Sequence, residues 1–189
     1  MKPIIYIIAG HSKSTPGATA YTGISEHTYT VELQSLVAKQ IKDCETLQGT
    51  SMDVITEDQI FSNYQVRQMI NTYATAGSRG IDIHFNNNNP SATGTEVVVS
   101  RNTSNENKLR AENIARRISV LLNIPHRKRV QSRGYMYPDE TFVGALAILD
   151  ETKIPMILVE VCFLNENDLK KYEANKKEVA KIIVEEMLK

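Results

Sequence analysis

The sequence predicts an α/β fold built on a twisted, mostly parallel mixed sheet that is flanked by helices. The first observation is the unbroken apolar run Ile4–Ala9, which ends at Gly10 and is typical of a strand buried on both faces. The second is the order of the patterns that follow, helix, strand, helix and strand, which indicates two parallel crossover units. The third is the composition, because 189 residues with 41% hydrophobic and 23% charged side chains suit one globular domain with a sizeable core. We therefore expect residues 1–189 to form a single domain.

The first half of the chain supplies the elements of these crossover units. A helix begins near Ser25, a good N-cap residue, and residues 52–56 form a short second strand. The pattern Ser62–Gln65 matches a capping box and begins a second helix, after which residues 81–83 form the third strand. Apolar residues at helical spacing define the faces that we expect to be buried. These are Tyr29, Leu33, Leu36, Val37 and Ile41 in the first helix, and Val66, Met69, Ile70, Tyr73 and Ala74 in the second.

The second half adds further strands and helices. β-branched residues in loose alternation indicate a strand near an edge of the sheet, and a later apolar run indicates a buried strand. In chain order, we expect an edge strand at 95–100, a helix at 107–122, an irregular or partly extended segment at 123–138, a short helix at 142–152, a strand at 155–161 and an amphipathic helix up to the C-terminus.

Charge and cysteine usage exclude several classes of function. Lysine plus arginine and aspartate plus glutamate both count 22, so no large basic field indicates a nucleic-acid partner. The locally basic stretch 108–133 is read as a solvated helix face and loop. Cys44 and Cys162 form neither a disulfide framework nor a metal-ligand spacing. No run approaches the roughly 20 apolar residues of a membrane helix, and the N-terminus lacks a signal-peptide pattern. We expect cytoplasmic synthesis and no membrane insertion.

Polar residues stand at the ends of the predicted strands. His11 follows the first strand, His84 follows the third, and Glu160 lies within the last. The carboxyl ends of strands are where open α/β sheets gather their ligands. A lone histidine there can equally be structural, and Glu26 alone would be a helix-start carboxylate favoured by the dipole. Glu160 differs, because a charge inside an apolar strand is costly unless it is paired.

Together these four side chains predict a zinc site. Catalytic zinc takes three protein ligands, two histidines and one glutamate being a known set, and keeps a fourth position open. A carboxylate that is not a ligand can then act as general base and return the proton to the leaving nitrogen.

An ordered series of short motifs identifies a family resemblance. The motifs are Ala9-Gly10-His11, Pro16-Gly17-Ala18, Glu26, Asp82-Ile83-His84-Phe85-Asn86, Gly94-Thr95-Glu96 and Pro155–Asn165. In this order the sequence resembles the zinc-dependent N-acetylmuramoyl-L-alanine amidases of the amidase-3 type over essentially the whole chain.

The resemblance implies a largely parallel, mixed sheet of about six strands. It also implies one Zn²⁺ ion held by His11, Glu26 and His84, with Glu160 as the catalytic glutamate. The expected reaction cleaves the amide bond between N-acetylmuramic acid and L-alanine in peptidoglycan. Two alternatives stay open, a zinc peptidase that cuts within the stem peptides and a non-catalytic wall-binding module of the same fold. Without a separate wall-binding domain, the chain looks like a phage or prophage endolysin that acts on the wall after release, although a host wall-remodelling role is also consistent with it.

Five further polar residues lie close to these motifs. Both Asn86 and Glu96 are candidate substrate-binding residues; Asn86 could instead hold its loop, and Glu96, expected in the cleft wall, could instead be structural. His27 is expected at the surface, because one helical position turns it roughly 100° from the predicted carboxylate ligand. Glu32 is a weaker alternative ligand, and His126 is expected to be solvated among basic residues.

Overall fold

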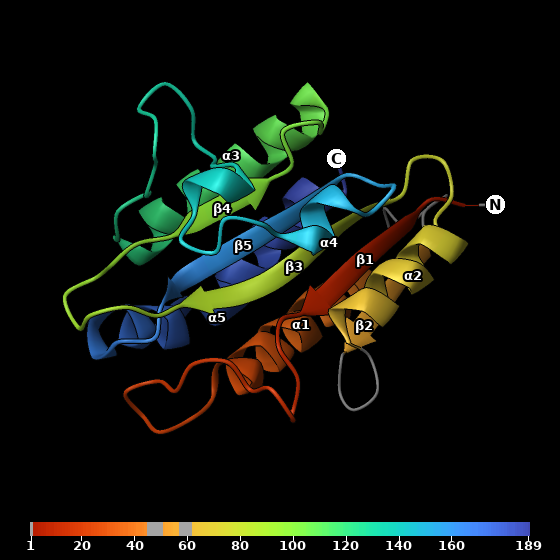
Figure 1. Cartoon of the computed structure of the whole chain (residues 1–189). Coiled ribbons are helices and arrows are strands. Elements are labelled where there is room, and N and C mark those ends of the chain that lie inside the picture. Colours follow the sequence, from red (N-terminus) through yellow and green to blue (C-terminus); the bar gives the residue numbers. More distant parts are fainter. Residues whose placement is uncertain (1, 45–50, 57–61) are drawn as a thin grey trace.

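The computed structural model describes residues 2–44, 51–56 and 62–189, and its centre is one mixed sheet (Figure 1). Within these residues the sheet has five strands in the order β2-β1-β3-β5-β4. The first four in this order run parallel, and β4 runs antiparallel to β5. The strands are β2 (Ser51–Thr56), β1 (Ile4–Ala9), β3 (Arg79–Asn86), β5 (Met156–Phe163) and β4 (Glu96–Val99).

The sixth strand implied by the family resemblance is not confirmed in the described part of the chain. The segment that comes nearest to it is 124–136, which lies beside β4. It pairs in parallel only at isolated bridges, Thr95 with His126 and Val98 with Met136. Pro125 has no backbone N–H to donate, and the residues between the two bridges leave the sheet as a loop. The segment is therefore partly extended, as predicted, without forming a strand.

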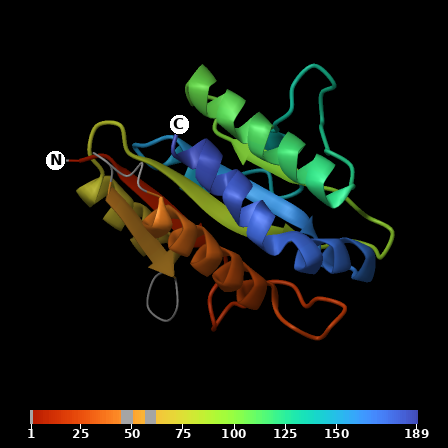
Figure 2. The ribbon, with the colours of Figure 1, turned by 180° about the vertical axis from the view of Figure 1, so that it is seen from behind.

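Helices cover both faces of the sheet. Figure 2 shows α1, α5 and α3 side by side on one face, and Figure 1 looks onto the other face, which α2 and α4 cover in part. Each set packs on its own apolar cluster. None of the described helices is both long and apolar enough to span a membrane. The helices are α1 (Glu26–Asp43), α2 (Asn63–Tyr73), α3 (Asn105–Leu122), α4 (Ala147–Asp150) and α5 (Glu166–Met187), with a 3₁₀ turn η2 at Pro138–Glu140.

Helix α2 begins as predicted but buries a narrower stripe. Ser62 and Gln65 form the expected capping box. Val66 and Ile70 are buried in the cluster, whereas Tyr73 is 64% exposed, which contradicts its predicted burial. Tyr73 is the last residue of the helix, beyond the part that packs on the sheet. Helical spacing gives the direction of a side chain, but it does not say how far the neighbouring layer extends.

The predicted helix at 142–152 is only the single turn α4. Phe142, at its expected start, is fully exposed and lies in a loop. Gly144 adopts φ +78°, a left-handed conformation that interrupts a right-handed helix. The helix can therefore form only after this glycine.

A buried carboxylate fixes the loop that leads into β4. Asp168, in the first turn of α5, accepts hydrogen bonds from Thr93 Oγ1 at 2.6 Å, the Gly94 amide at 3.0 Å and the Phe163 amide at 3.3 Å. Its side chain is buried. The end of β5 and the start of β4 are thus held to one carboxylate, and Glu160 and Glu96 lie on these two strands.

We expect Asp168→Ala to lower the free energy of unfolding by about 2–4 kcal/mol, because it leaves several buried donors without an acceptor. Denaturant unfolding measures this loss. Glu178→Ala is the matched control, since Glu178 is an exposed acidic residue on the same helix; its expected change is within about 0.5 kcal/mol. Equal stabilities of the two variants would contradict the role given to Asp168.

Candidate metal centre

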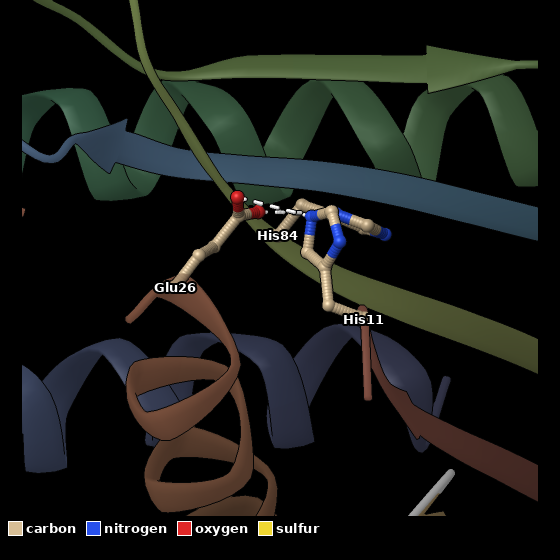
Figure 3. A group of neighbouring side chains, drawn as sticks. All are labelled: His11, Glu26 and His84. Atoms are coloured by element: carbon tan, nitrogen blue, oxygen red, sulfur yellow. Dashed lines mark hydrogen bonds and ion pairs between the residues drawn. The ribbon is translucent and has the colours of Figure 1, made fainter. Parts of the chain in front are cut away.

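Three side chains from separate elements meet at the carboxyl end of the sheet. One glycine separates His11 from the end of β1. Glu26 is the first residue of α1, and His84 lies near the end of β3. Because β1 and β3 are adjacent and parallel, their ends fall at the same edge. Figure 3 shows the two imidazoles and the carboxylate directed at one another. One potential ligand atom from each lies within 4.8 Å of the other two.

The Glu26 carboxylate lies between the two histidines. Its Oε2 is 3.0 Å from Nε2 of His11, and its Oε1 is 3.2 Å from Nδ1 of His84 (Figure 3). Backbone amides complete its contacts, with Ala18 N–H donating to Oε2 at 3.2 Å and Phe85 N–H donating to Oε1 at 3.1 Å. Glu26 is only 4% exposed. This buried carboxylate is therefore compensated by donors from three segments of the chain.

Two glycines leave the space that the imidazoles fill. A Cβ on Gly10 would lie 2.4 Å from Cε1 of His84. A Cβ on Gly17 would lie 2.6 Å from Cδ2 of His11 and 2.7 Å from Oε2 of Glu26. His11 itself has φ +65°, a conformation that non-glycine residues rarely adopt and that marks functional sites when the surroundings enforce it. The backbone is thus shaped around this group of side chains.

Charge pairing shifts the pKa values of this site. Burial alone would raise the pKa of Glu26, but hydrogen bonds and charges of His11 and His84 lower it to about 2. Burial alone would lower the pKa of His84, but the charge of Asp82, hydrogen bonds to Asp82 and Glu26, and the charge of Glu160 raise it well above its usual value. Without a metal, the Glu26 carboxylate thus pairs with the His84 imidazolium. A divalent cation would replace the proton, so this donor set fits a metal that binds in competition with protons.

Glu160 lies beside this group on the next strand. It is the register partner of His84 on one side and of Glu96 on the other. Its Oε2 is buried and has no hydrogen-bond partner among the described residues. Burial raises the pKa of Glu160 to about 8; the charge of His84 opposes this shift, and the nearby carboxylates reinforce it. A carboxyl group in this range can both accept and donate a proton near neutral pH.

The two candidate substrate contacts flank Glu160 and His84. Glu96 is buried and pairs with Nε of Arg127, whose guanidinium lies over the ring of Phe163 with 5.1 Å between Cζ and the ring centroid. Asn86 ends β3, is half-buried, and accepts a backbone hydrogen bond from Leu164 at 2.9 Å. Both border the site, and their contact with substrate stays a prediction.

The expected surface position of His27 is wrong. His27 is 5% exposed, and its Nδ1 lies 3.1 Å from the carbonyl oxygen of Gly10. Its backbone N–H also donates to the carbonyl of Pro16 at 3.1 Å. The loop that carries His11 folds over the start of α1 and covers a side of the helix that its own periodicity leaves open.

Glu32 and His126 contact partners outside the metal-ligand group. Glu32 pairs with Lys176 of α5 and is outside the metal-ligand group. His126 is half-buried, with Nε2 2.8 Å from the carbonyl oxygen of Gly134, so the expectation of a solvated ring is wrong. The isolated bridge with Thr95, just before β4, holds this histidine beside the sheet.

Sequence reasoning assigned no role to Asp82. Asp82 is 7% exposed, and its Oδ2 lies 3.4 Å from Nε2 of His84. The signal was present as spacing, because residues two apart on a strand share one face of the sheet.

Comparison with known proteins agrees with this architecture. Residues 5–189 match the Amidase_3 family, described as N-acetylmuramoyl-L-alanine amidase. The catalytic domain of CwlV, such an amidase from Bacillus (Paenibacillus) polymyxa var. colistinus, is 20% identical with TM-score 0.75, over 97% of this chain and 95% of that one. An N-acetylmuramoyl-L-alanine amidase from Clostridium difficile 630 is 19% identical with TM-score 0.76, over 99% and 95%. The catalytic domain of the CD27L endolysin, which targets Clostridia difficile, is 23% identical with TM-score 0.72, over 100% and 97%. These likenesses show a shared fold. The comparison with curated proteins finds no match.

We expect Gly17→Ala to weaken Zn²⁺ binding by about 10- to 100-fold, because its methyl group displaces His11 and Glu26. Competition with a chromophoric chelator measures the affinity. Gly23→Ala is the matched control, since Gly23 has a similar φ of +82° but no atom within 4 Å of the added Cβ. Both variants carry the backbone strain, and only the first carries the clash. The same affinity in both would show that this cradle does not shape the site.

The raised pKa of Glu160 predicts a pH-dependent stability of the metal-free protein. In the folded protein Glu160 keeps a proton that the unfolded chain releases above pH 4.5. The free energy of unfolding therefore falls as the pH rises from 4.5 to about 8. Glu160→Gln removes this loss. We expect the metal-free variant to exceed the metal-free wild type by about 1–3 kcal/mol at pH 8 and to match it near pH 4. Urea unfolding in the presence of a chelator tests this, and a difference that is independent of pH would refute it.

Proposed function

The chain belongs to the N-acetylmuramoyl-L-alanine amidase family, and from this membership we propose that it is a zinc-dependent hydrolase in which Glu160 acts as general base. Its substrate is peptidoglycan, and the bond cleaved joins the lactyl carbonyl of N-acetylmuramic acid to the nitrogen of L-alanine. The observation that carries the proposal is the group of His11, Glu26 and His84, whose potential ligand atoms lie within 4.8 Å of one another.

The donor set supports zinc as the metal. Two imidazole nitrogens and one carboxylate oxygen are a ligand set that catalytic zinc uses, with one position left for water or substrate. A bound zinc ion would make water acidic enough to supply a nucleophile near neutral pH and would polarise a carbonyl oxygen. His11, Glu26 and His84 would hold it.

Glu160 supplies the proton transfers. Its buried Oε2 lacks a hydrogen-bond partner among the described residues, which leaves it able to accept a proton from the attacking water. The water oxygen then bonds to the lactyl carbon, the carbon–nitrogen bond breaks, and Glu160 returns the proton to the alanine nitrogen. The products are a lactyl carboxylic acid and a free amine. A pKa of about 8 suits both directions of transfer.

Glu96 stands opposite Glu160 in the pair β4–β5, and Asn86 is two residues past His84 on β3. Asn86 carries an amide that can both donate and accept hydrogen bonds, as recognition of a peptide or an N-acetyl group requires. Glu96 is neutralised by Arg127, so the pair presents a polar wall without a net charge. We propose both as substrate contacts. The single-domain organisation and the action on the wall after release stay predictions.

Paired variants separate metal binding from proton transfer. We expect Glu160→Gln to keep one zinc ion per chain and to lose about 10²- to 10⁴-fold in turnover, because only the base is removed. His84→Ala is expected to lose both the metal and the activity. Elemental analysis measures zinc, and end-group analysis of digested sacculi measures new L-alanine amines. Glu32→Gln is the control that should retain both.

Three outcomes would count against this mechanism. If Glu160→Gln cleaves at a rate within about tenfold of the wild-type rate, Glu160 is not the base. His84→Ala that keeps stoichiometric zinc would remove His84 as a ligand. New amines inside the stem peptide, with none on L-alanine, would favour the peptidase alternative.

A further inference from the structure

One buried carboxylate near the site has no role in the reaction described so far. Asp82 lies in the middle of β3, with Ile8 of β1 and Leu158 of β5 as its register partners. Both neighbours belong to the apolar cluster beneath α2 and α4. An ionised carboxylate on such a surface is costly unless a partner compensates it. Its presence there needs a specific contact.

The contact is with the ring of His84. Asp82 Oδ2 lies 3.4 Å from Nε2, while Nδ1 on the other side of the ring lies 3.2 Å from Glu26 Oε1. The two imidazole nitrogens thus face two different carboxylates. Asp82 Oδ1 is buried and has no hydrogen-bond partner in the described part of the chain. The His84 ring therefore provides the polar contact that accounts for this carboxylate.

We infer that Asp82 is a positioning residue for the metal centre: it accepts a hydrogen bond from Nε2–H of His84 and thereby keeps the Nδ1 lone pair directed at the metal. The inference rests on the proposed function, because it requires His84 to be a ligand. Histidine ligands commonly donate their second ring N–H to a carboxylate, which fixes both tautomer and ring orientation.

The geometry of β3 makes this contact rigid. The strand is paired with β1 on one side and with β5 on the other, so its backbone is held on both edges. Residues 82 and 84 point to the same face because side chains alternate along a strand. Gly10 lies against the ring, where a Cβ would come within 2.4 Å of Cε1. The imidazole is thus held between a glycine, Glu26 and Asp82.

Zinc affinity and a proton signal test the inference. Asp82→Leu replaces the carboxylate with a side chain that suits the apolar neighbours, and we expect it to bind Zn²⁺ about 10- to 100-fold more weakly than the wild type. Asp82→Asn keeps the shape and a neutral acceptor, so its loss should be smaller, about threefold to tenfold. In the zinc-loaded wild type, ¹⁵N-edited NMR should show the Nε2–H proton of His84 as a slowly exchanging signal. Asp82→Leu should lose this signal.

A charge control separates contact from general electrostatics. Glu96→Gln removes another buried carboxylate from the same region, although Glu96 has its contact with Arg127 instead of His84. Its Zn²⁺ affinity should stay within about threefold of the wild type, well short of the loss typical of an outer-shell contact.

The possible results distinguish a failure of this inference from a failure of the proposed function on which it rests. Wild-type protein that binds no zinc would overturn the proposed function. If the wild type binds zinc and both Asp82→Asn and Asp82→Leu bind it as tightly as the wild type does, only the role of Asp82 is overturned. A lowered stability with unchanged affinity and an unchanged Nε2–H signal would make Asp82 merely structural. If Asp82→Leu does not fold, the affinity and the proton signal of Asp82→Asn decide the question.

Discussion

The carboxylate of Glu26 is the contact on which the site depends, because it joins three separate segments at two oxygen atoms. One oxygen meets His11 after β1 and the Ala18 amide in the following loop, and the other meets His84 and the Phe85 amide on β3. A buried carboxylate is stable only with such donors. The start of α1, the loop and the strand are therefore fixed around one group. In the metal-free protein the site is held by pairing of opposite charges, and the groups that provide this pairing are those a metal would take over.

One face of the sheet changes from apolar to polar toward the carboxyl ends of its strands, where this charge lies. Beneath α2 and α4 the face is apolar up to Ile8 and Leu158, apart from Asp82, which stands between them on β3. Two residues further along their strands stand Gly10 and Glu160, and His84 lies between them on β3. The opposite face stays apolar to the strand ends, where α1, α3 and α5 cover it. The hydrophobic core thus holds the strands from one side, while the carboxyl end of the other side carries the chemistry. On that side Glu26 and Asp82 face the ring of His84, whereas burial raises the pKa of Glu160 to about 8.

Sequence reasoning located each of the described strands and brought His11 and His84 together from pattern and topology, whereas Glu26 became the third ligand candidate through the family resemblance. The ends of adjacent parallel strands must meet, whichever side chains they carry. It failed where a distant segment decides the environment. The burial of His27 depends on the course of the loop over α1, and the exposure of Tyr73 depends on where the neighbouring layer stops. The spacing along β3 places Asp82 on the same face as His84, but only the structure shows that the two side chains are in contact.

The pairing register explains why ligand and base lie side by side. His84 stands opposite Glu160 in the parallel pair β3–β5, and a slip of one residue would turn one of them to the other face. Immediately past this pair the register shifts, so that Asn86 stands opposite Phe163. Val161 and Cys162 can then both pack into the core beneath α1 and α5, although strict alternation would place them on opposite faces. Irregularities of this kind often adjoin active sites, where they re-aim side chains. Here the shift returns β5 to the core directly after Glu160, so the apolar residues on both sides of Glu160 fix the position of the one carboxyl group between them.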